Sequence, residues 1–386
     1  MICDVLFAAL ALLSFALLLW QCLAAQRFPL HRRIAGADFA PPVSILKPLK
    51  GCDETTAASL ESWLNQEYAG PMQFLFGVAD AADPACKIIE ELLKRHPQAN
   101  AQLLVCGASL GANAKVSTLA QLEKSAVNEL VLVSDADVRA PADFLVNMVA
   151  PLREERVALT HCFYRLANPA TAAMQWEAVA INADFWSQVL QSQTLRPLDF
   201  ALGAAILLRR KALDHIGGFK SLVNCLADDF QIGHRLAKNN LGLSLCPVVV
   251  ECWDAPMGWR QVWKHQLRWA RTIRVCRPLP YFFSILSNAT LWPLLWAAVS
   301  AGTAGTICAP LTAAALVLVR ICLAQQLQRR LTPQRKLVSP FWSVPLKDLL
   351  QAAIWFCAFA GNTVEWRGQK MKLRTDGTLI AINGAN

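Results

Sequence analysis

The segment Glu129–Phe144 reads ELVLVSDADVRAPADF and places an apolar run directly before two carboxylates. Residues 130–133 are all Leu or Val, which is typical of a strand buried in a parallel sheet. Asp135 and Asp137 follow, one residue apart, and then Arg139 and a proline. Open parallel sheets bind ligands at the carboxyl ends of their strands. The segment therefore predicts a buried strand that ends in a ligand-binding site.

The neighbouring segments alternate between the periods of strands and helices. Apolar runs such as VSILKPL are followed by amphipathic runs such as DPACKIIEELLKRH, in which proline stands near the helix start. This alternation implies right-handed crossovers and a mostly parallel sheet with helices on both faces. We predict a Rossmann-like α/β fold in which Asp80, Gly107 and Asp135 stand at strand ends. The expected strands are 43–49, 73–80, 101–107 and 129–137, and the expected helices are 54–68, 83–96, 114–125 and 141–153.

Three apolar segments predict contact with a membrane. Residues 5–25 carry no charge, and about 20 such residues cross a bilayer core as a helix. A cleaved signal peptide is the alternative explanation of this segment, but such a peptide should begin with a positively charged region, which this chain lacks. Residues 282–319 form a second uncharged block, long enough for two spans folded as a hairpin. The sequence leaves three placements open for residues 349–364, namely a full span, a re-entrant segment and a helix at the membrane interface.

Positive charges predict the orientation of these segments. The basic residues that follow the first segment place the N-terminus outside and the rest in the cytoplasm, by the positive-inside rule. Four full spans would leave the basic tail after residue 366 outside, against that rule. The basic residues that follow the first segment and decide its orientation are Arg27, His31, Arg32 and Arg33.

The composition supports a membrane protein and argues against nucleic-acid binding. Of the 386 residues 55% are hydrophobic, 13 are tryptophan, and the net charge is +9; a soluble enzyme is rarely this apolar. A basic chain can bind nucleic acid, anionic lipid or phosphorylated substrates. Zinc-finger spacing and basic runs interleaved with aromatic residues are missing, so we predict no nucleic-acid partner. The 13 cysteines contain no CxxC pair, which favours buried thiols in a reducing compartment.

Three explanations fit two aspartates at the end of a strand. Asp135 and Asp137 are compatible with a solvated turn. A phosphatase-like nucleophile is the second explanation, but it usually takes the first strand of a domain with Thr or Val four residues later, where this chain has Arg139. The third is a divalent cation, Mg²⁺ or Mn²⁺, shared with the phosphates of a substrate. A cation removes the repulsion between two close carboxylates.

Two predicted helix starts carry residues suited to phosphate binding and acid–base chemistry. Lys115 lies in GASLGANAKVSTL, a glycine-bearing loop that enters a helix and suits a phosphate or a sugar hydroxyl. Asp228 and Asp229 open the amphipathic helix DDFQIGHRLAK. N-capping is the plain explanation of such acids. A cap needs only one acid, so the other is free for chemistry.

A further acid and a basic helix favour the metal interpretation. Asp80 closes the strand QFLFGVAD, and Asp83 follows three residues later. The segment WKHQLRWARTIR, residues 263–274, gathers Arg268 and Trp269 with two more arginines. Its plain explanation is a basic helix at a membrane surface. Cations there would also suit a diphosphate.

In this order the motifs resemble those of the ceramide glucosyltransferase family, which belongs to the processive and lipid-linked branch of the inverting GT-A glycosyltransferases. The family includes bacterial relatives associated with hopanoid biosynthesis. The resemblance covers roughly residues 42–274 and continues into the tail NTVEWRGQKMKL. The blocks that carry it are SILKPLKGCDE, VADAADPA, GANAKV, VSDADVR, ALGAAILLRRKALDHIGGF, LADDFQIGHRLA and HQLRWARTIR.

The resemblance implies roles for individual residues. Asp229 would be the catalytic base, with Asp228 beside it. Asp80 would contact the nucleotide base. His265 departs from the family, whose motif Q/R-x-x-R-W begins with Gln or Arg. The residues implied for the donor site are Asp80, Asp83, Lys115, Asp135, Asp137, His265, Arg268 and Trp269, and those for a Mg²⁺ or Mn²⁺ ion are Asp135 and Asp137.

The implied activity is transfer of a hexose, glucose or N-acetylglucosamine, from a UDP-sugar to the hydroxyl of a ceramide-like or hopanoid membrane lipid. One base suffices for such an inverting displacement. A processive polysaccharide synthase and a non-catalytic nucleotide- or lipid-binding scaffold remain alternatives. The apolar helix at 173–190 would line an acceptor entrance or pack in the core.

The implied location is a bacterial inner membrane, with the catalytic domain in the cytoplasm. The expected organisation combines this GT-A domain with N-terminal and C-terminal transmembrane helices. The expected domains are a transmembrane helix at 1–26, a cytoplasmic GT-A domain at 27–280, membrane segments at 281–366 and a basic tail at 367–386.

Overall fold

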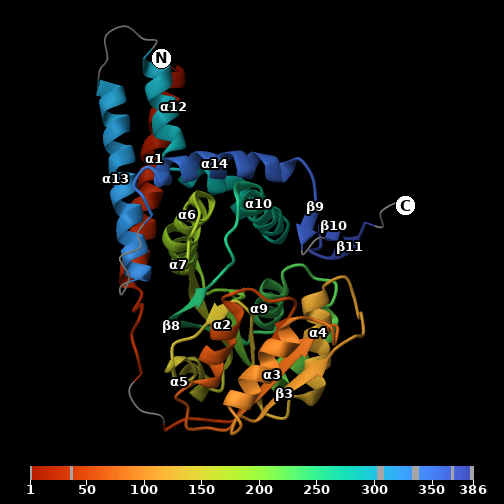
Figure 1. Ribbon diagram of the computed structural model, residues 1–386. Coiled ribbons are helices and arrows are strands. Elements are labelled where there is room, and N and C mark those ends of the chain that lie inside the picture. Colours follow the sequence, from red (N-terminus) through yellow and green to blue (C-terminus); the bar gives the residue numbers. More distant parts are fainter. Residues whose placement is uncertain (1, 35–37, 302–307, 333–338, 367–368, 383–386) are drawn as a thin grey trace. The chain divides into compact units, whose positions relative to one another are not determined.

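The computed structural model describes residues 2–34, 38–301, 308–332, 339–366 and 369–382. The chain forms two units that interleave along the sequence, and Figure 1 shows both coloured by residue number. The sheet unit comprises Pro29–Asn168, Leu198–Ala255 and Gly377–Asn386. The helical unit comprises Met1–Phe28, Pro169–Pro197 and Pro256–Asp376.

The described part of the sheet unit is built on an eight-stranded sheet with strand order β3-β2-β1-β4-β7-β6-β8-β5. β1 pairs in parallel with β2 and β4, and β2 pairs in parallel with β3. β7 is antiparallel to both β4 and β6, while β6 and β8 are parallel. The strands are β1 Val43–Leu49, β2 Met72–Val78, β3 Ala101–Val105, β4 Leu130–Ser134, β5 Val138–Arg139, β6 Val157–Leu166, β7 Ala205–Arg209 and β8 Gly242–Cys252.

The predicted α/β fold is confirmed, and helices connect the parallel strands. At the start of two of these helices, a side-chain oxygen accepts a hydrogen bond from a free backbone N–H group. Asp53 Oδ1 accepts from the N–H of Thr55 at 2.8 Å before α2. Asn113 Oδ1 accepts from the N–H of Val116 at 3.1 Å at the start of α4. The helices of this unit are α2 Thr56–Leu64, α3 Ala85–Arg95, α4 Ala114–Leu122, α5 Phe144–Val149, α8 Arg210–His215 and α9 Asp228–Lys238.

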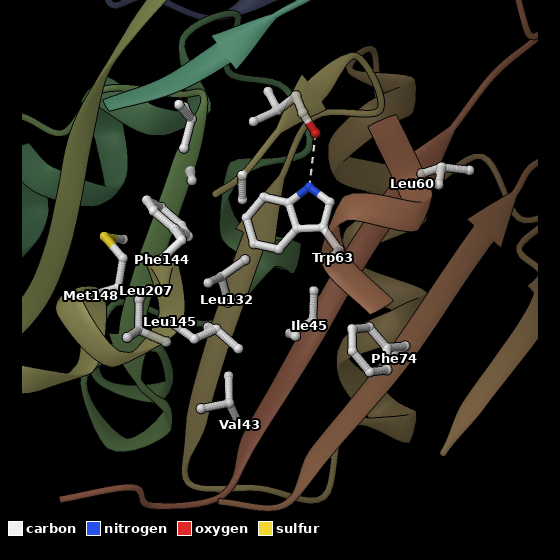
Figure 2. Packing of buried hydrophobic residues seen from close by; sticks show 14 of the residues in the cluster. Val43, Ile45, Leu60, Trp63, Phe74, Leu132, Phe144, Leu145, Met148 and Leu207 are labelled. Atoms are coloured by element: carbon white, nitrogen blue, oxygen red, sulfur yellow. Dashed lines mark hydrogen bonds between the residues drawn. The ribbon is translucent and has the colours of Figure 1, made fainter. Parts of the chain in front are cut away.

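Trp63 of α2 lies at the centre of the hydrophobic core on one face of the sheet (Figure 2). Its Nε1 donates a hydrogen bond to the carbonyl of Val138 at 2.8 Å, the dashed line in Figure 2. Its ring meets Phe144 edge-on, with ring centroids 5.5 Å apart. Because Val138 directly follows Asp137, this core fixes the backbone that carries the two aspartates. Alternate strand residues such as Leu46 and Val131 pack in a second core cluster, which lies on the other face.

The helical unit joins three segments that are far apart in the sequence. In Figure 1, α1, α12 and α13 lie side by side, and α14 runs roughly perpendicular to them, from beside α1 toward β9. A π-helix interrupts one long helix between α6 and α7. The elements are α1 Ile2–Arg27, α6 Ala172–Val179, the π-helix Ala180–Phe185, α7 Trp186–Leu195, α10 Trp259–Cys276, α11 Pro278–Phe283, α12 Leu291–Ser300, α13 Cys308–Leu331, α14 Ser343–Phe359, β9 Thr363–Trp366 and β10 Gln369–Leu373.

Among the described helices, α1 and α13 are long and apolar enough to cross a membrane, judged by length and composition. The pair Pro278–Ser287 and Leu291–Ser300 would form a third span if taken together, but it is bent by 52°.

The block expected to fold as two spans, 282–319, therefore contains most of this bent pair and only part of α13, while residues 302–307 lie outside the described residues. α13 continues beyond that block to Leu331, and the charge of Arg320 within it is compensated by Asp184 and Asp348. The third candidate segment overlaps α14, which ends at Phe359.

Candidate functional site

The two aspartates of the D-x-D motif lie between β4 and β5 at the carboxyl edge of the parallel strands. β4 ends at Ser134, and β5 begins at Val138 and pairs antiparallel with the end of β8. The carbonyl of Asp137 accepts from the N–H of Trp253 at 3.0 Å. The sequence prediction for the position of this motif is thus confirmed at the level of the fold.

Lys115 connects two of the predicted acidic positions. Its Nζ lies 2.8 Å from Asp135 Oδ1 and 3.3 Å from Asp228 Oδ2. Burial by itself lowers the pKa of Lys115, but the two carboxylates outweigh burial and hold that pKa well above its usual value. The Asp135 side chain stays 40% exposed, whereas that of Asp228 is 10% exposed. Asp135 is therefore the partner of Lys115 that a ligand can reach.

A second lysine, Lys47, supports the same edge and was missed by the sequence reasoning. It is buried within β1, and its Nζ donates to Asp135 O at 2.8 Å and to Ser134 Oγ at 3.1 Å. The ammonium also lies 4.1 Å from the Trp63 ring centroid, a cation–π contact. Burial lowers the pKa of Lys47 to about 7. Its signal in the sequence was a lysine inside the apolar strand VSILKPL.

The pKa of the Asp137 carboxyl is perturbed by burial and by the charge of Asp135. Burial, and next the negative charge of Asp135, raise the pKa of Asp137 to about 7. A cation beside such a pair would relieve the repulsion. In the described part of the chain, no three His, Cys, Asp or Glu side chains gather around one point. Two carboxylates fit Mg²⁺ or Mn²⁺, because such ions commonly take one or two carboxylates and complete their shell with substrate phosphates.

The acid pair at the start of α9 consists of two carboxyls in different environments. Asp228 is ion-paired with Lys115. Asp229 Oδ1 accepts from the N–H of Phe230 at 2.7 Å, and a Cβ at Gly203 would lie 2.6 Å from Asp229 Oδ2, so glycine there leaves room for this carboxyl. Burial, and next the charge of Asp228, raise the pKa of Asp229 to about 7. A carboxyl that titrates near neutrality suits a general base.

The two acids after β2, Asp80 and Asp83, differ in the hydrogen bonds that they accept. Asp80 is exposed, and its Oδ1 accepts from the N–H of Ala82 at 2.9 Å. Asp83 accepts from the N–H groups of Ala85 at 2.9 Å and Gly51 at 3.0 Å. Asp83 thus ties the loop after β1 to the start of α3. The predicted contacts of both acids with a donor remain predictions.

The predicted motif around Arg268 lies on α10, in the helical unit. His265 Nδ1 and Gln266 Nε2 each lie 2.8 Å from Glu177 Oε1, so both nitrogens contact one buried carboxylate. Trp269 contacts His265, with ring centroids 4.7 Å apart. Glu177 was also missed by the sequence reasoning. Its signal was a lone acid in the apolar run AMQWEAVA.

Arg268 lines a small cleft of about 190 Å³ between α10 and the β9–β10 hairpin. Lys264, Arg271 and Lys370 also line this cleft, although Lys264 is paired with Glu365 at 2.7 Å. The surplus of cations suits an anionic ligand.

Comparison with solved structures supports the expected fold. A mannosyltransferase from Pyrobaculum calidifontis, solved in complex with GDP-Man and Mn²⁺, is 18% identical, and the match covers 93% of this chain and 98% of that chain with a TM-score of 0.57. At this identity the likeness concerns the fold, which is the expected GT-A type. The sequence then gives the family: the chain belongs to glycosyl transferase family 21, whose sequence model matches residues 6–379.

Curated relatives match the chain over a shorter stretch. Ceramide glucosyltransferase 3 of Caenorhabditis elegans is 26% identical over 222 residues, which cover 56% of this chain and 47% of the relative. Ceramide glucosyltransferase 1 of the same organism is 25% identical over 205 residues, covering 53% and 43%. The match thus spans under half the length of each relative.

Proposed function

We propose that this protein is an inverting glycosyltransferase that moves a hexose, glucose or N-acetylglucosamine, from a UDP-sugar to the hydroxyl of a ceramide-like or hopanoid lipid. The observation that carries the proposal is the acidic edge of the sheet, where Lys115 joins Asp135 to Asp228. The adjacent Asp229 has a pKa raised to about 7. The names of the relatives, ceramide glucosyltransferases, support a lipid acceptor.

Each group has one task in the proposed reaction. Asp229 accepts the proton of the lipid hydroxyl while that oxygen attacks the anomeric carbon. The bond from that carbon to the UDP diphosphate breaks in the same displacement, which inverts the configuration. A Mg²⁺ or Mn²⁺ ion held by Asp135 and Asp137 would neutralise negative charge on the leaving diphosphate. Arg268 would add a further positive charge there, and Asp80 would bind the nucleotide base.

The direct test is product analysis. Purified protein is incubated with a panel of UDP-sugars and lipid extracts, and the products are identified by mass spectrometry. A lipid carrying one hexose, with inverted anomeric configuration, is the expected product. A polymer would favour a processive synthase, and donor binding without turnover would favour a scaffold; either result would reject the proposal.

The pKa of Asp229 predicts the pH dependence of transfer. Below about pH 7 the carboxyl is protonated and cannot accept a proton; above it the carboxylate is ionised. We therefore expect kcat/KM to rise with pH through about 7 and to fall on acidification. Because the charge of Asp228 contributes to the raised pKa, Asp228→Asn should move the midpoint to lower pH. A flat profile between pH 5 and 8 would contradict the role of Asp229 as base.

The proposed location is the cytoplasmic face of a bacterial inner membrane, with the N-terminus outside. Cys3 and Cys52 are both exposed thiols and provide a matched pair of labelling sites. Among variants that retain one exposed cysteine, a membrane-impermeant maleimide should label Cys3 in intact cells and Cys52 only after permeabilisation. The reverse pattern would reverse the orientation.

A further inference from the structure

Four charged side chains form an ionic cluster inside the helical unit. Arg320 of α13 donates through Nη2 to Asp184 Oδ2 at 2.8 Å and to Asp348 Oδ1 at 2.9 Å. Lys347 donates to Asp184, and also to Asp348 Oδ1 at 3.1 Å. All four side chains are buried. Two cations thus balance two anions, as burial requires, because an uncompensated buried charge is strongly unfavourable.

Asp184 enters this cluster from the π-helix Ala180–Phe185. π-Helical turns are rare and occur frequently at functional sites. Such a turn is wider than an α-helical turn, so it changes the directions in which the following side chains leave the helix. The next residue, Phe185, contacts the ring of Trp269 on α10, with centroids 6.2 Å apart. Adjacent residues of the π-helix therefore contact a membrane helix and the helix that carries the R-W pair.

The same long helix holds α10 at a second point. Glu177, on α6, accepts hydrogen bonds at 2.8 Å from the side chains of His265 and Gln266. Glu177 and Phe185 stand eight residues apart along α6 and the π-helix. These two contacts hold the same part of α10, from His265 to Trp269, so a change in the π-helix would move Trp269 and its neighbour Arg268.

We propose that Asp184 is a positioning residue for the R-W pair. Its ion pairs with Arg320 and Lys347 fix the π-helix, and the π-helix holds Phe185 against Trp269. The inference rests on the proposed function, in which Arg268 and Trp269 serve the donor site. It gives α13 a part in donor binding beyond anchorage in the membrane.

The cluster offers a matched pair of variants. Asp184→Asn and Asp348→Asn each remove one buried negative charge that pairs with both Arg320 and Lys347, but only Asp184 lies on the π-helix. We expect both variants to lower the thermal midpoint in detergent. Only Asp184→Asn should also lower kcat/KM for the UDP-sugar, by up to about 10²-fold, since small misplacements of binding groups have effects of that size.

A third variant separates the positioning of Trp269 from the charge of the ionic cluster. Phe185→Leu removes the ring contact with Trp269 and leaves the ionic cluster intact. It should reproduce the kinetic loss of Asp184→Asn with a smaller change in thermal midpoint. It also keeps the proposal testable if Asp184→Asn fails to fold. Equal kinetic losses in the two Asp variants, or unchanged kcat/KM in Phe185→Leu, would overturn the proposal.

Amide hydrogen exchange tests the coupling without any need for activity. In Asp184→Asn, exchange should rise in peptides that cover the π-helix and also in those that cover α10, because exchange reports local opening. In Asp348→Asn the rise should lie in α13, in α14 and in the end of α10 that contacts α14 through Arg274 and Phe359, and the π-helix should be unchanged. If the wild type transfers no sugar, the proposed function fails while this test still stands. Unchanged exchange in α10 of Asp184→Asn would reject the coupling itself.

Discussion

Replacing Asp229 with Asn is expected to reduce sugar transfer by about 10²- to 10⁴-fold, the usual cost of losing a general base. Asparagine keeps the size of the side chain and can still accept from the N–H of Phe230, but it cannot take a proton at neutral pH. The ion pairs of Lys115 with Asp135 and Asp228 do not involve Asp229. Donor binding, measured by calorimetry with UDP-sugar, should therefore stay close to the wild-type value.

The neighbouring acid provides the control. Asp228→Asn removes one ion-pair partner of Lys115 but leaves Asp229 in place, so we expect a smaller loss of transfer. If Asp228→Asn is inactive while Asp229→Asn retains turnover, then Asp228 is the base. If both variants retain turnover, a single-base inverting mechanism is wrong.

Removal of divalent metal should abolish transfer, and Mg²⁺ or Mn²⁺ should restore it. Charge stabilisation at a leaving diphosphate contributes several kcal/mol, and each 1.36 kcal/mol is about tenfold in rate, so we expect a loss of about 10²-fold or more. Asp137→Asn takes away one of the two candidate ligands. The variant should need much more metal for half-maximal activity.

A surface aspartate of the same unit is the matched control for this experiment. Asp143 is ion-paired with Arg33, and its side chain is 38% exposed, so Asp143→Asn should leave the metal requirement unchanged. Full activity of the wild type in excess chelator would reject a metal at the D-x-D motif.

Features set by local sequence were predictable. The apolar runs of the first four strands and the amphipathic runs between them predicted the parallel half of the sheet. The same reasoning placed Asp135 at a strand end and Asp228 at a helix start. That Lys115 contacts both acids was not predictable in this way, because β3 is not a neighbour of β4 in the sheet, and β7, the strand before Asp228, is antiparallel to β4. The catalytic roles of these residues remain predictions.

Features set by distant partners were not predictable. The sequence reasoning ended an apolar block at Val319 because a charge follows, yet α13 passes through Arg320. The compensating acids, Asp184 and Asp348, lie 136 and 28 residues away in the sequence. Glu177 and Lys47 are similar cases, since a buried charge is tolerated only through partners that the fold supplies. The π-helix likewise has no simple local signature.

The interleaving of the two units determines the order in which the protein can assemble during synthesis. The sheet unit needs Leu198–Ala255, which supplies β7, β8 and α9, and by then α1 and the helix Ala172–Leu195 have already left the ribosome. Cotranslational folding generally proceeds from the N-terminus. The nascent chain must therefore keep its helical unit unfinished while its sheet is completed. No single cleavage of the chain separates one unit intact from the other.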